Sequence, residues 1–175
     1  MSKPLIIFSH GKEGTPNGSK ILQLTAVAKE HNCQTLSMDY RTINSPDSRV
    51  DKLLNIASNH PAPLVLVGSS MGSYISIVAS KQIKPKGLFL LAPALYLDGY
   101  KNQNPIASAK LTSVVHGWSD DVVPVANAIT FSQKQKTRLH LLDADHRLLS
   151  AMPIIKNLFS LFLDELITGE ESDSF

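Results

Sequence analysis

Short apolar runs alternate along the chain with longer segments whose apolar residues recur every three or four positions. Several of the short runs are apolar at consecutive positions, which is typical of parallel strands that are covered on both faces. The runs that predict strands are residues 5–8, 35–38, 64–67, 87–91, 113–115 and 139–142. Strands that alternate with helices predict a doubly wound α/β domain with a mostly parallel six-stranded sheet between two helical layers.

The longer segments predict five helices. Residues 19–30 carry apolar side chains at helical spacing, and Ser45-Pro46 reads as a capping residue followed by proline in the first turn of the next helix. The predicted helices cover residues 19–30, 46 to at least 57, 71–82, about 124 to at least 132, and 148–166.

One stretch, residues 92–110, departs from this alternation. It holds Pro93, Gly99 and Pro105 and shows no clean period. It is long for a simple connection, so we expect it to form a small cap over a site. No repeat or linker divides the chain. We therefore expect a single domain over residues 1–168 and a frayed acidic tail over residues 169–175.

Composition narrows the classes of partner. The 175 residues carry 17 Lys+Arg against 15 Asp+Glu, which is too balanced to favour nucleic acid or an anionic membrane surface. The one cysteine, Cys33, fits a reducing compartment. The first apolar run is too short for a signal peptide, and no run approaches the roughly 20 residues of a membrane span. We expect a cytoplasmic protein; its oligomeric state stays open.

The segment Gly68-Ser69-Ser70-Met71-Gly72 fits the pattern Gly-x-Ser-x-Gly. It follows an apolar strand and precedes a predicted helix, which is the context that this motif requires. Such a tight turn exposes the serine above the sheet, at a helix N-terminus that favours developing negative charge. Ser70 is the predicted nucleophile.

A serine nucleophile needs a base, and motifs of this kind place an acid and then a histidine after the serine. His146 directly follows the last predicted strand, where sites form on parallel sheets, and is the predicted base. His31 and His60 lie near helix ends, and His140 lies within the last strand.

The predicted acid follows the preceding strand. Asp120 is favoured over its neighbour Asp121, and its role would be to accept a hydrogen bond from the His146 ring. Asp145 is adjacent to His146, and adjacent side chains usually diverge. Asp143 stays as a further alternative.

An oxyanion needs two converging N–H donors. The backbone of Met71, after the nucleophile, is one predicted donor, and the backbone of Lys12, in the loop after the first strand, is the other. Gly11 lets the chain pass close to a substrate, and His10 is expected to hold the loop by hydrogen bonds.

Together these motifs resemble the α/β-hydrolase superfamily, and most of all the small lidless bacterial serine hydrolases of the dienelactone hydrolase and carboxylesterase branches. The resemblance spans nearly the whole chain. It implies that His10-Gly11 precedes an oxyanion donor and that the segment His116-Gly117 to Val123-Pro124 presents the acid at Asp120. The usual N-terminal antiparallel hairpin and large cap domain are lacking, which implies a minimal sheet with strand order 2-1-3-4-5-6.

The expected activity is hydrolysis of a small ester or thioester through an acyl-enzyme on Ser70, with no metal and no organic cofactor. A thioesterase or a carbon–carbon hydrolase with the same triad, and a catalytically silent binding protein, are the alternatives. Tyr96 and Trp118 are candidate substrate contacts.

Overall fold

The computed structural model describes residues 3–61 and 63–172. Six strands form one sheet in the order β2-β1-β3-β4-β5-β6, and every neighbouring pair is parallel. This confirms the predicted fold class and strand order. The strands are β1 (Leu5–Ser9), β2 (Gln34–Ser37), β3 (Leu64–Ser69), β4 (Gly87–Leu91), β5 (Leu111–Gly117) and β6 (Arg138–Leu142).

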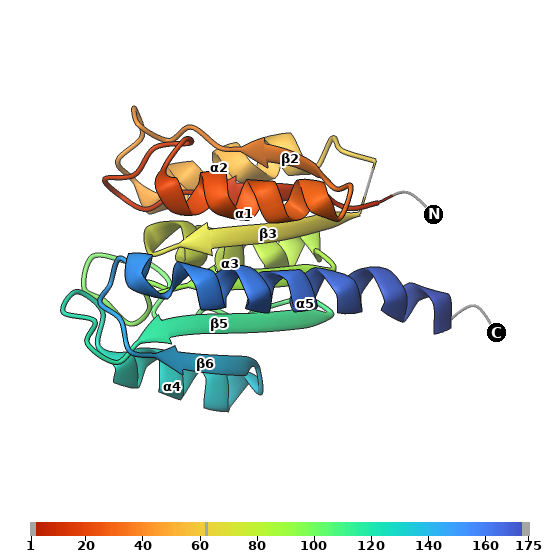
Figure 1. The fold of residues 1–175 in the computed structure, drawn as a ribbon. Coiled ribbons are helices and arrows are strands. Elements are labelled where there is room, and N and C mark those ends of the chain that lie inside the picture. The colour runs from red at the N-terminus through yellow and green to blue at the C-terminus, as the bar shows by residue number, and fades with distance from the viewer. Residues whose placement is uncertain (1–2, 62, 173–175) are drawn as a thin grey trace.

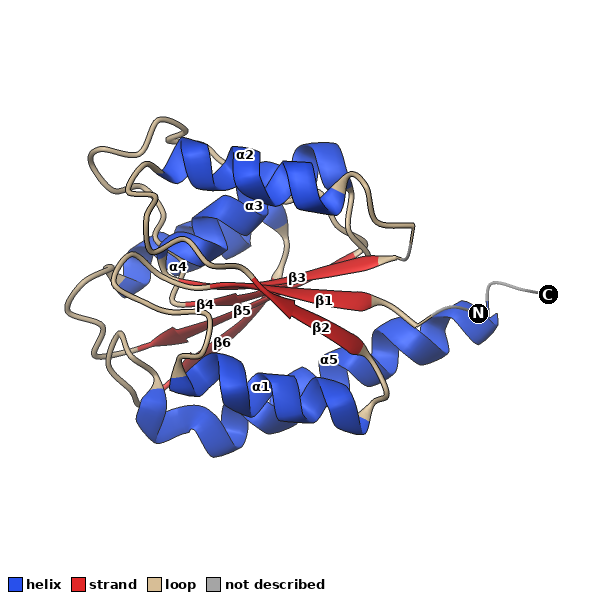
Figure 2. Cartoon of the chain, turned by 90° about the horizontal axis from the view of Figure 1, so that it is seen from above, coloured by secondary structure: helices blue, strands red, loops and turns tan. Residues whose placement is uncertain are grey.

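Helices cover both faces of the sheet (Figure 2). One layer holds α1 and α5, and the other holds α2, α3 and α4. Each layer closes its own hydrophobic cluster against the sheet, which is why β1 and β4 are buried at every position. The helices are α1 (Ser19–Glu30), α2 (Pro46–Ala57), α3 (Met71–Ile83), α4 (Val125–Gln135) and α5 (Met152–Ser172), with a 3₁₀ turn, η1 (Leu149–Ala151), before α5.

Local sequence signals account for several helix boundaries. Ser45 caps α2 as predicted, since its side chain accepts a hydrogen bond from the Ser48 N–H at 3.3 Å and Pro46 follows it. At the other end of the chain the expectation fails in part. The backbone of residues 169–172 continues α5 and is not a frayed tail. Residues 173–175 of the predicted tail lie outside the described residues.

The segment 92–110 forms neither a helix nor a strand. It packs on α3: the ring centroids of Tyr100 and Tyr74 lie 4.7 Å apart, and the Asn102 N–H donates to the Tyr74 hydroxyl at 3.0 Å. Further along, the Ser108 N–H donates to the Ser80 hydroxyl at 2.9 Å. The segment is thus fastened to the α3 side of the sheet.

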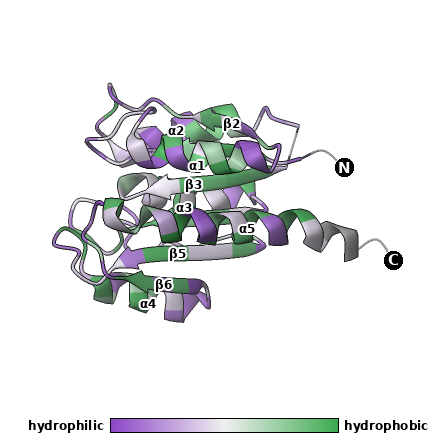
Figure 3. Cartoon of the chain, in the orientation of Figure 1, coloured by the Kyte–Doolittle hydropathy of each residue, from purple (hydrophilic) through white to green (hydrophobic). Residues whose placement is uncertain are grey.

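Because all the strands are parallel, their carboxyl ends lie at one edge (Figure 1). The loops at this edge are largely hydrophilic, whereas β3 and β6 are mostly hydrophobic and β5 is mixed (Figure 3). No helix in the described ranges combines the length and apolarity needed to cross a membrane.

The first turn of α3 lies against the end of β1 so closely that Gly72 has no room for a side chain. A Cβ at Gly72 would meet the backbone carbonyl of Ser9. We expect Gly72→Ala to lower the free energy of unfolding by roughly 3 kcal/mol or more, because backbone on both sides would have to shift. Urea unfolding measures this.

Gly169→Ala is the matched control, since a Cβ at Gly169 meets nothing within 4 Å and the residue lies in α5. That variant should be neutral or slightly more stable. Equal stability of the two variants would show that the close contact at Gly72 is not a constraint.

Candidate active site

Ser70 lies between β3 and α3 in a strained turn. Its φ of 54° and ψ of −116° are unusual for a non-glycine residue. The turn is enforced from both sides, because a Cβ at Gly68 would meet the backbone of Gly72 and Ser73, and a Cβ at Gly72 would meet Ser9. The strain lifts the Ser70 side chain out of the sheet at the N-terminus of α3.

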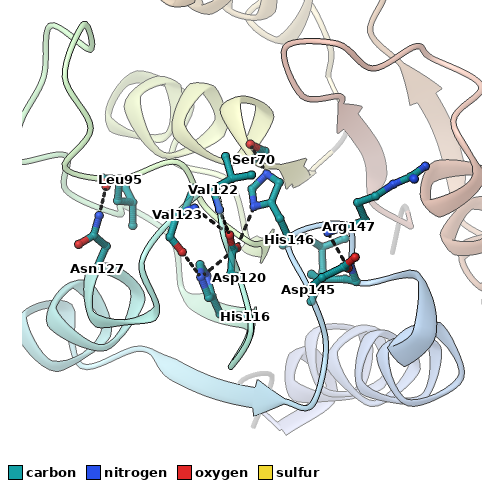
Figure 4. Close-up of polar contacts among 12 residues, drawn as sticks. Ser70, Leu95, His116, Asp120, Val122, Val123, Asn127, Asp145, His146 and Arg147 are labelled. Carbon is teal, nitrogen blue, oxygen red and sulfur yellow. Dashed lines mark hydrogen bonds and ion pairs between the residues drawn. The ribbon is translucent and has the colours of Figure 1, made fainter.

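His146 bridges Ser70 and Asp120 (Figure 4). Its Nε2 lies 3.0 Å from the Ser70 Oγ, and its Nδ1 lies 2.8 Å from the Asp120 Oδ2. The carboxylate can only accept, so Nδ1 carries the proton and Nε2 is left to accept from the serine hydroxyl. The structure therefore brings together the three side chains that the sequence singles out.

The Asp120 carboxylate is fully buried and fully used. Its Oδ1 accepts from the backbone N–H groups of Val122 at 2.9 Å and Val123 at 2.7 Å. Its Oδ2 faces His146 and, at 3.1 Å, the Nε2 of His116. Four donors around one carboxylate fix its orientation and compensate its desolvation.

The alternative acids do not reach His146 in this structure. Asp121 and Asp143 are exposed. The Asp145 Oδ1 accepts from the N–H groups of Arg147 at 3.0 Å and Leu148 at 3.1 Å, so this side chain closes the turn that follows β6. The geometry thus favours Asp120 among the four candidates.

His116 is a site residue that the sequence analysis left without a role. It is fully buried in β5, and its Nε2 lies 2.9 Å from the Val123 carbonyl as well as close to Asp120. Two acceptors at Nε2 place the proton there, and Nδ1 is buried without a partner among the described residues. Burial lowers the pKa of His116, which fits a neutral ring. The sequence carries one signal for this residue: His116 begins the pattern His-Gly-x-x-Asp, which ends at Asp120.

The loop after β1 is held by its Gly11 carbonyl. This oxygen lies 2.7 Å from the His10 Nδ1, and it accepts from the Gly14 N–H at 3.1 Å and from the Arg49 guanidinium at 3.1 Å. The other ring nitrogen of His10 accepts from the Tyr40 N–H at 3.0 Å, so His10 carries its proton on Nδ1. His10 is a structural hydrogen-bonding residue, as expected.

Arg49 fastens this loop to α2 and is only 1% exposed. Besides the Gly11 carbonyl, its guanidinium donates to the carbonyls of Lys12 at 3.2 Å and Ile43 at 2.6 Å. Its charged group also lies 5.3 Å from the centroid of the Tyr40 ring. A buried arginine held by three carbonyls is a second feature that sequence periodicity does not reveal.

The orientation of the Gly11 carbonyl sets the direction of the Lys12 N–H. Both belong to one planar trans peptide, in which the C=O and the N–H point in opposite directions. Donors on one side therefore turn the Lys12 N–H to the other side. Within residues 3–61 and 63–172, neither this N–H nor that of Met71, in the first turn of α3, donates to a protein acceptor.

A cavity of about 510 Å³ opens beside Ser70 and His146. Its wall is formed by the loop after β1, the start of α1, the loop after β6 and Val122. Neither Tyr96 nor Trp118 lines it: Tyr96 packs in the cluster under α3 and α4 with Lys134 over its ring, and Trp118 is 56% exposed. The segment 92–110 does not line this cavity either, although its Ala94 N–H donates to the Ser70 carbonyl at 3.2 Å.

In the described part of the chain, no group of three or more His, Cys, Asp or Glu side chains is arranged to hold a metal ion.

The fold and the strand–serine–helix turn define an α/β-hydrolase-fold protein, and solved structures agree. One neighbour is a protein of Xanthomonas campestris pv. campestris that is described as a hydrolase of the alpha/beta superfamily. Its TM-score is 0.86 at 29% sequence identity, over 93% of this chain and 99% of that one. Est1E from Butyrivibrio proteoclasticus has a TM-score of 0.80 at 19% identity, over 95% and 89%.

A further neighbour from Xanthomonas campestris is described as a serine hydrolase without a lid. Its TM-score is 0.76 at 17% identity, over 89% of this chain and 78% of that one. No family model matches the sequence, and no curated protein matches it. The neighbours therefore support a hydrolase of the α/β superfamily.

Burial lowers the pKa values of three histidines, His10, His116 and His140. The unfolded chain then binds more protons than the folded one below about pH 6.5, so folding stability is present above that pH and is lost as the pH falls. We expect the free energy of unfolding to decrease steadily from about pH 7.5 to about pH 5.5. Urea unfolding followed by circular dichroism measures it.

His116→Gln keeps an N–H donor on the side chain but removes the titration. Its stability should depend less steeply on pH than that of the natural chain. An unchanged slope in this variant, or a gain of stability on acidification, would contradict the assignment of a neutral buried His116.

Proposed function

We propose that this protein is a serine hydrolase that cleaves a carboxylic ester or thioester through an acyl-enzyme on Ser70. The observation that carries the proposal is the position of His146, which contacts the Ser70 hydroxyl with one ring nitrogen and the buried Asp120 carboxylate with the other. A serine becomes an effective nucleophile when a histidine so oriented accepts its proton.

In the first step the Ser70 Oγ bonds to the acyl carbon while its proton passes to the His146 Nε2. The tetrahedral oxyanion collapses, the bond from the acyl carbon to the leaving oxygen or sulfur breaks, and His146 returns the proton to that leaving group. Water then attacks the acyl carbon by the same route, which releases the carboxylic acid and restores the Ser70 hydroxyl. Asp120 stabilises the imidazolium in both steps.

The backbone N–H groups of Lys12 and Met71 are the proposed oxyanion donors. Two observations support this: both groups lack an intramolecular acceptor within the described ranges, and they flank Ser70 from the β1 loop and from α3.

One structural neighbour, Est1E, is described with ferulic acid bound, and a carboxylic acid is the kind of product that ester hydrolysis releases.

The nucleophile is tested by Ser70→Ala. We expect hydrolysis of a short-chain 4-nitrophenyl ester to fall at least about 10³-fold, because the acyl-enzyme can no longer form. The natural chain should also be labelled at Ser70 by a fluorophosphonate probe, and the variant should not.

Ser132→Ala is the control, because the Ser132 hydroxyl lies buried on α4 without a protein hydrogen-bond partner. Its rate should stay within about twofold of the natural rate. If the natural chain were neither labelled nor active on esters and thioesters, the fold would serve binding rather than hydrolysis.

Arg49 is a positioning residue in this proposal, since it acts through the loop that carries the Lys12 N–H. We expect Arg49→Met to lower kcat at least about tenfold with a smaller change in KM, because the oxyanion donor loses its fixed direction. Arg49→Lys should be intermediate, because an ammonium cannot reproduce the planar fork.

Arg138→Met serves as the matched control, since Arg138, the first residue of β6, forms an exposed ion pair with Glu165. Unfolding curves for every variant separate loss of fold from loss of rate. A folded Arg49→Met protein with full kcat would contradict the role assigned to Arg49.

A further inference from the structure

The cavity beside Ser70 has a charged wall on the side of α1. Four ionisable side chains line it in addition to His10 and His146: three cations, Lys12, Lys20 and Arg147, and one carboxylate, Glu13. No Asp lines the cavity. The wall that a substrate meets next to the nucleophile is therefore positive.

Lys20 is the most enclosed of these cations. It lies in the first turn of α1 and is only partly exposed. Its ammonium forms no hydrogen bond or ion pair with any other described residue. Burial, together with the charge of Arg147, lowers the pKa of Lys20 to about 8 even though Asp145 and Asp120 attract it. A desolvated cation without a partner gains most from an anion brought to it.

Arg147 reaches the same wall from the opposite loop. Its backbone is fixed by the Asp145 side chain, and its guanidinium extends away from His146 (Figure 4). Like Lys20, this guanidinium has no carboxylate partner among the described residues. Lys12, Glu13 and Arg147 are all exposed, so their charges are solvated at the rim, and Lys20 is the partly buried one among the four.

The N-terminus of α1 also contributes positive charge to this wall. Its N-cap is Gly18, which offers no side-chain cap, and no acidic residue lies in the first turn. Gly18 and the first three residues of the helix, from Ser19 to Ile21, line the cavity. Uncapped N–H groups at a helix N-terminus add partial positive charge to that of Lys20.

We propose that this cavity selects substrates that carry an anionic group, a carboxylate or a phosphate, at a distance from the scissile carbonyl, and that Lys20 and Arg147 bind this group. The inference rests on the hydrolase function proposed above and names its substrate class. The carbonyl lies at Ser70, and the anion lies at the α1 wall of the same cavity.

The test compares esters that differ in charge but little in size. Mono-4-nitrophenyl succinate ends in a carboxylate where 4-nitrophenyl butyrate ends in a methyl group. At constant ionic strength we expect kcat/KM of the natural chain to be at least about tenfold higher for the succinate. The preference should decrease as the pH rises through about 8, because Lys20 then loses its charge.

Two variants assign the preference to residues. Lys20→Met and Arg147→Gln should each reduce the ratio of the two kcat/KM values several-fold, mainly through a higher KM for the succinate. Lys29→Met is the matched control, since Lys29 is an exposed lysine in the last turn of the same helix. Its ratio should equal that of the natural chain.

Inhibition separates the two kinds of anion. Inorganic phosphate and succinate are each titrated as competitive inhibitors of butyrate hydrolysis. Stronger inhibition by phosphate assigns the site to phosphorylated substrates, and stronger inhibition by succinate assigns it to carboxylated ones; both should weaken in Lys20→Met.

Failure of the proposed substrate class can be distinguished from failure of the proposed hydrolase function. Equal kcat/KM values for the two esters, with no inhibition by either anion, overturn the substrate class but leave the hydrolase intact. Absence of hydrolysis of both esters, without fluorophosphonate labelling, overturns the hydrolase itself. A preference for the succinate that survives in both variants would overturn the assignment to Lys20 and Arg147.

Discussion

The close contact between the first turn of α3 and the ends of β1 and β3 is the constraint on which the site depends. Gly68 and Gly72 leave no space for a side chain, so the chain between them must turn sharply. The sharp turn places Ser70 at a positive φ, a conformation that costs of order 1–3 kcal/mol and persists only when its surroundings enforce it. The same contact brings the end of β1 beside the serine. One packing contact thereby sets both the nucleophile and the loop that faces it.

Two buried charged side chains, Asp120 and Arg49, position the rest of the site through hydrogen bonds. Asp120 is a buried anion surrounded by donors, and Arg49 is a buried cation surrounded by acceptors. Behind His146, four donors surround the Asp120 carboxylate, so a buried negative charge is fully compensated. Under the loop after β1, the buried Arg49 is compensated by three carbonyls and by the Tyr40 ring. Neither arrangement is an ion pair with a mobile surface partner. Each fixes a group that has to be rigid for the proposed acyl transfer, the ring of His146 in one case and the N–H of Lys12 in the other.

The fold could be predicted from the sequence because runs of consecutive apolar residues and helix caps are local signals. The sequence also singled out Ser70, Asp120 and His146, since these follow strand ends in a fixed order. It gave no means of placing Tyr96 relative to the cavity, because which side of the sheet a loop covers depends on packing: residues 92–110 are fastened to α3. The roles of Arg49 and His116 were not predicted, for a related reason. A buried polar side chain is recognised by its partners, and those partners are distant in the sequence or hidden in the backbone.

The positive charge of the cavity wall follows from where the buried carboxylate lies. The acid of the site is sealed behind His146, so its negative charge is compensated where no substrate reaches it (Figure 4). Lys20 and Arg147 form no ion pair with a described carboxylate, and both line the wall that a substrate does reach. Desolvating Lys20 costs folding free energy in the free protein, since its pKa is lowered. A cost of this kind is offset when an anion binds. The same positive wall lies beside Ser70, where the proposed mechanism forms an oxyanion. In that mechanism the positive charges would therefore favour both an anionic substrate and the negatively charged transition state.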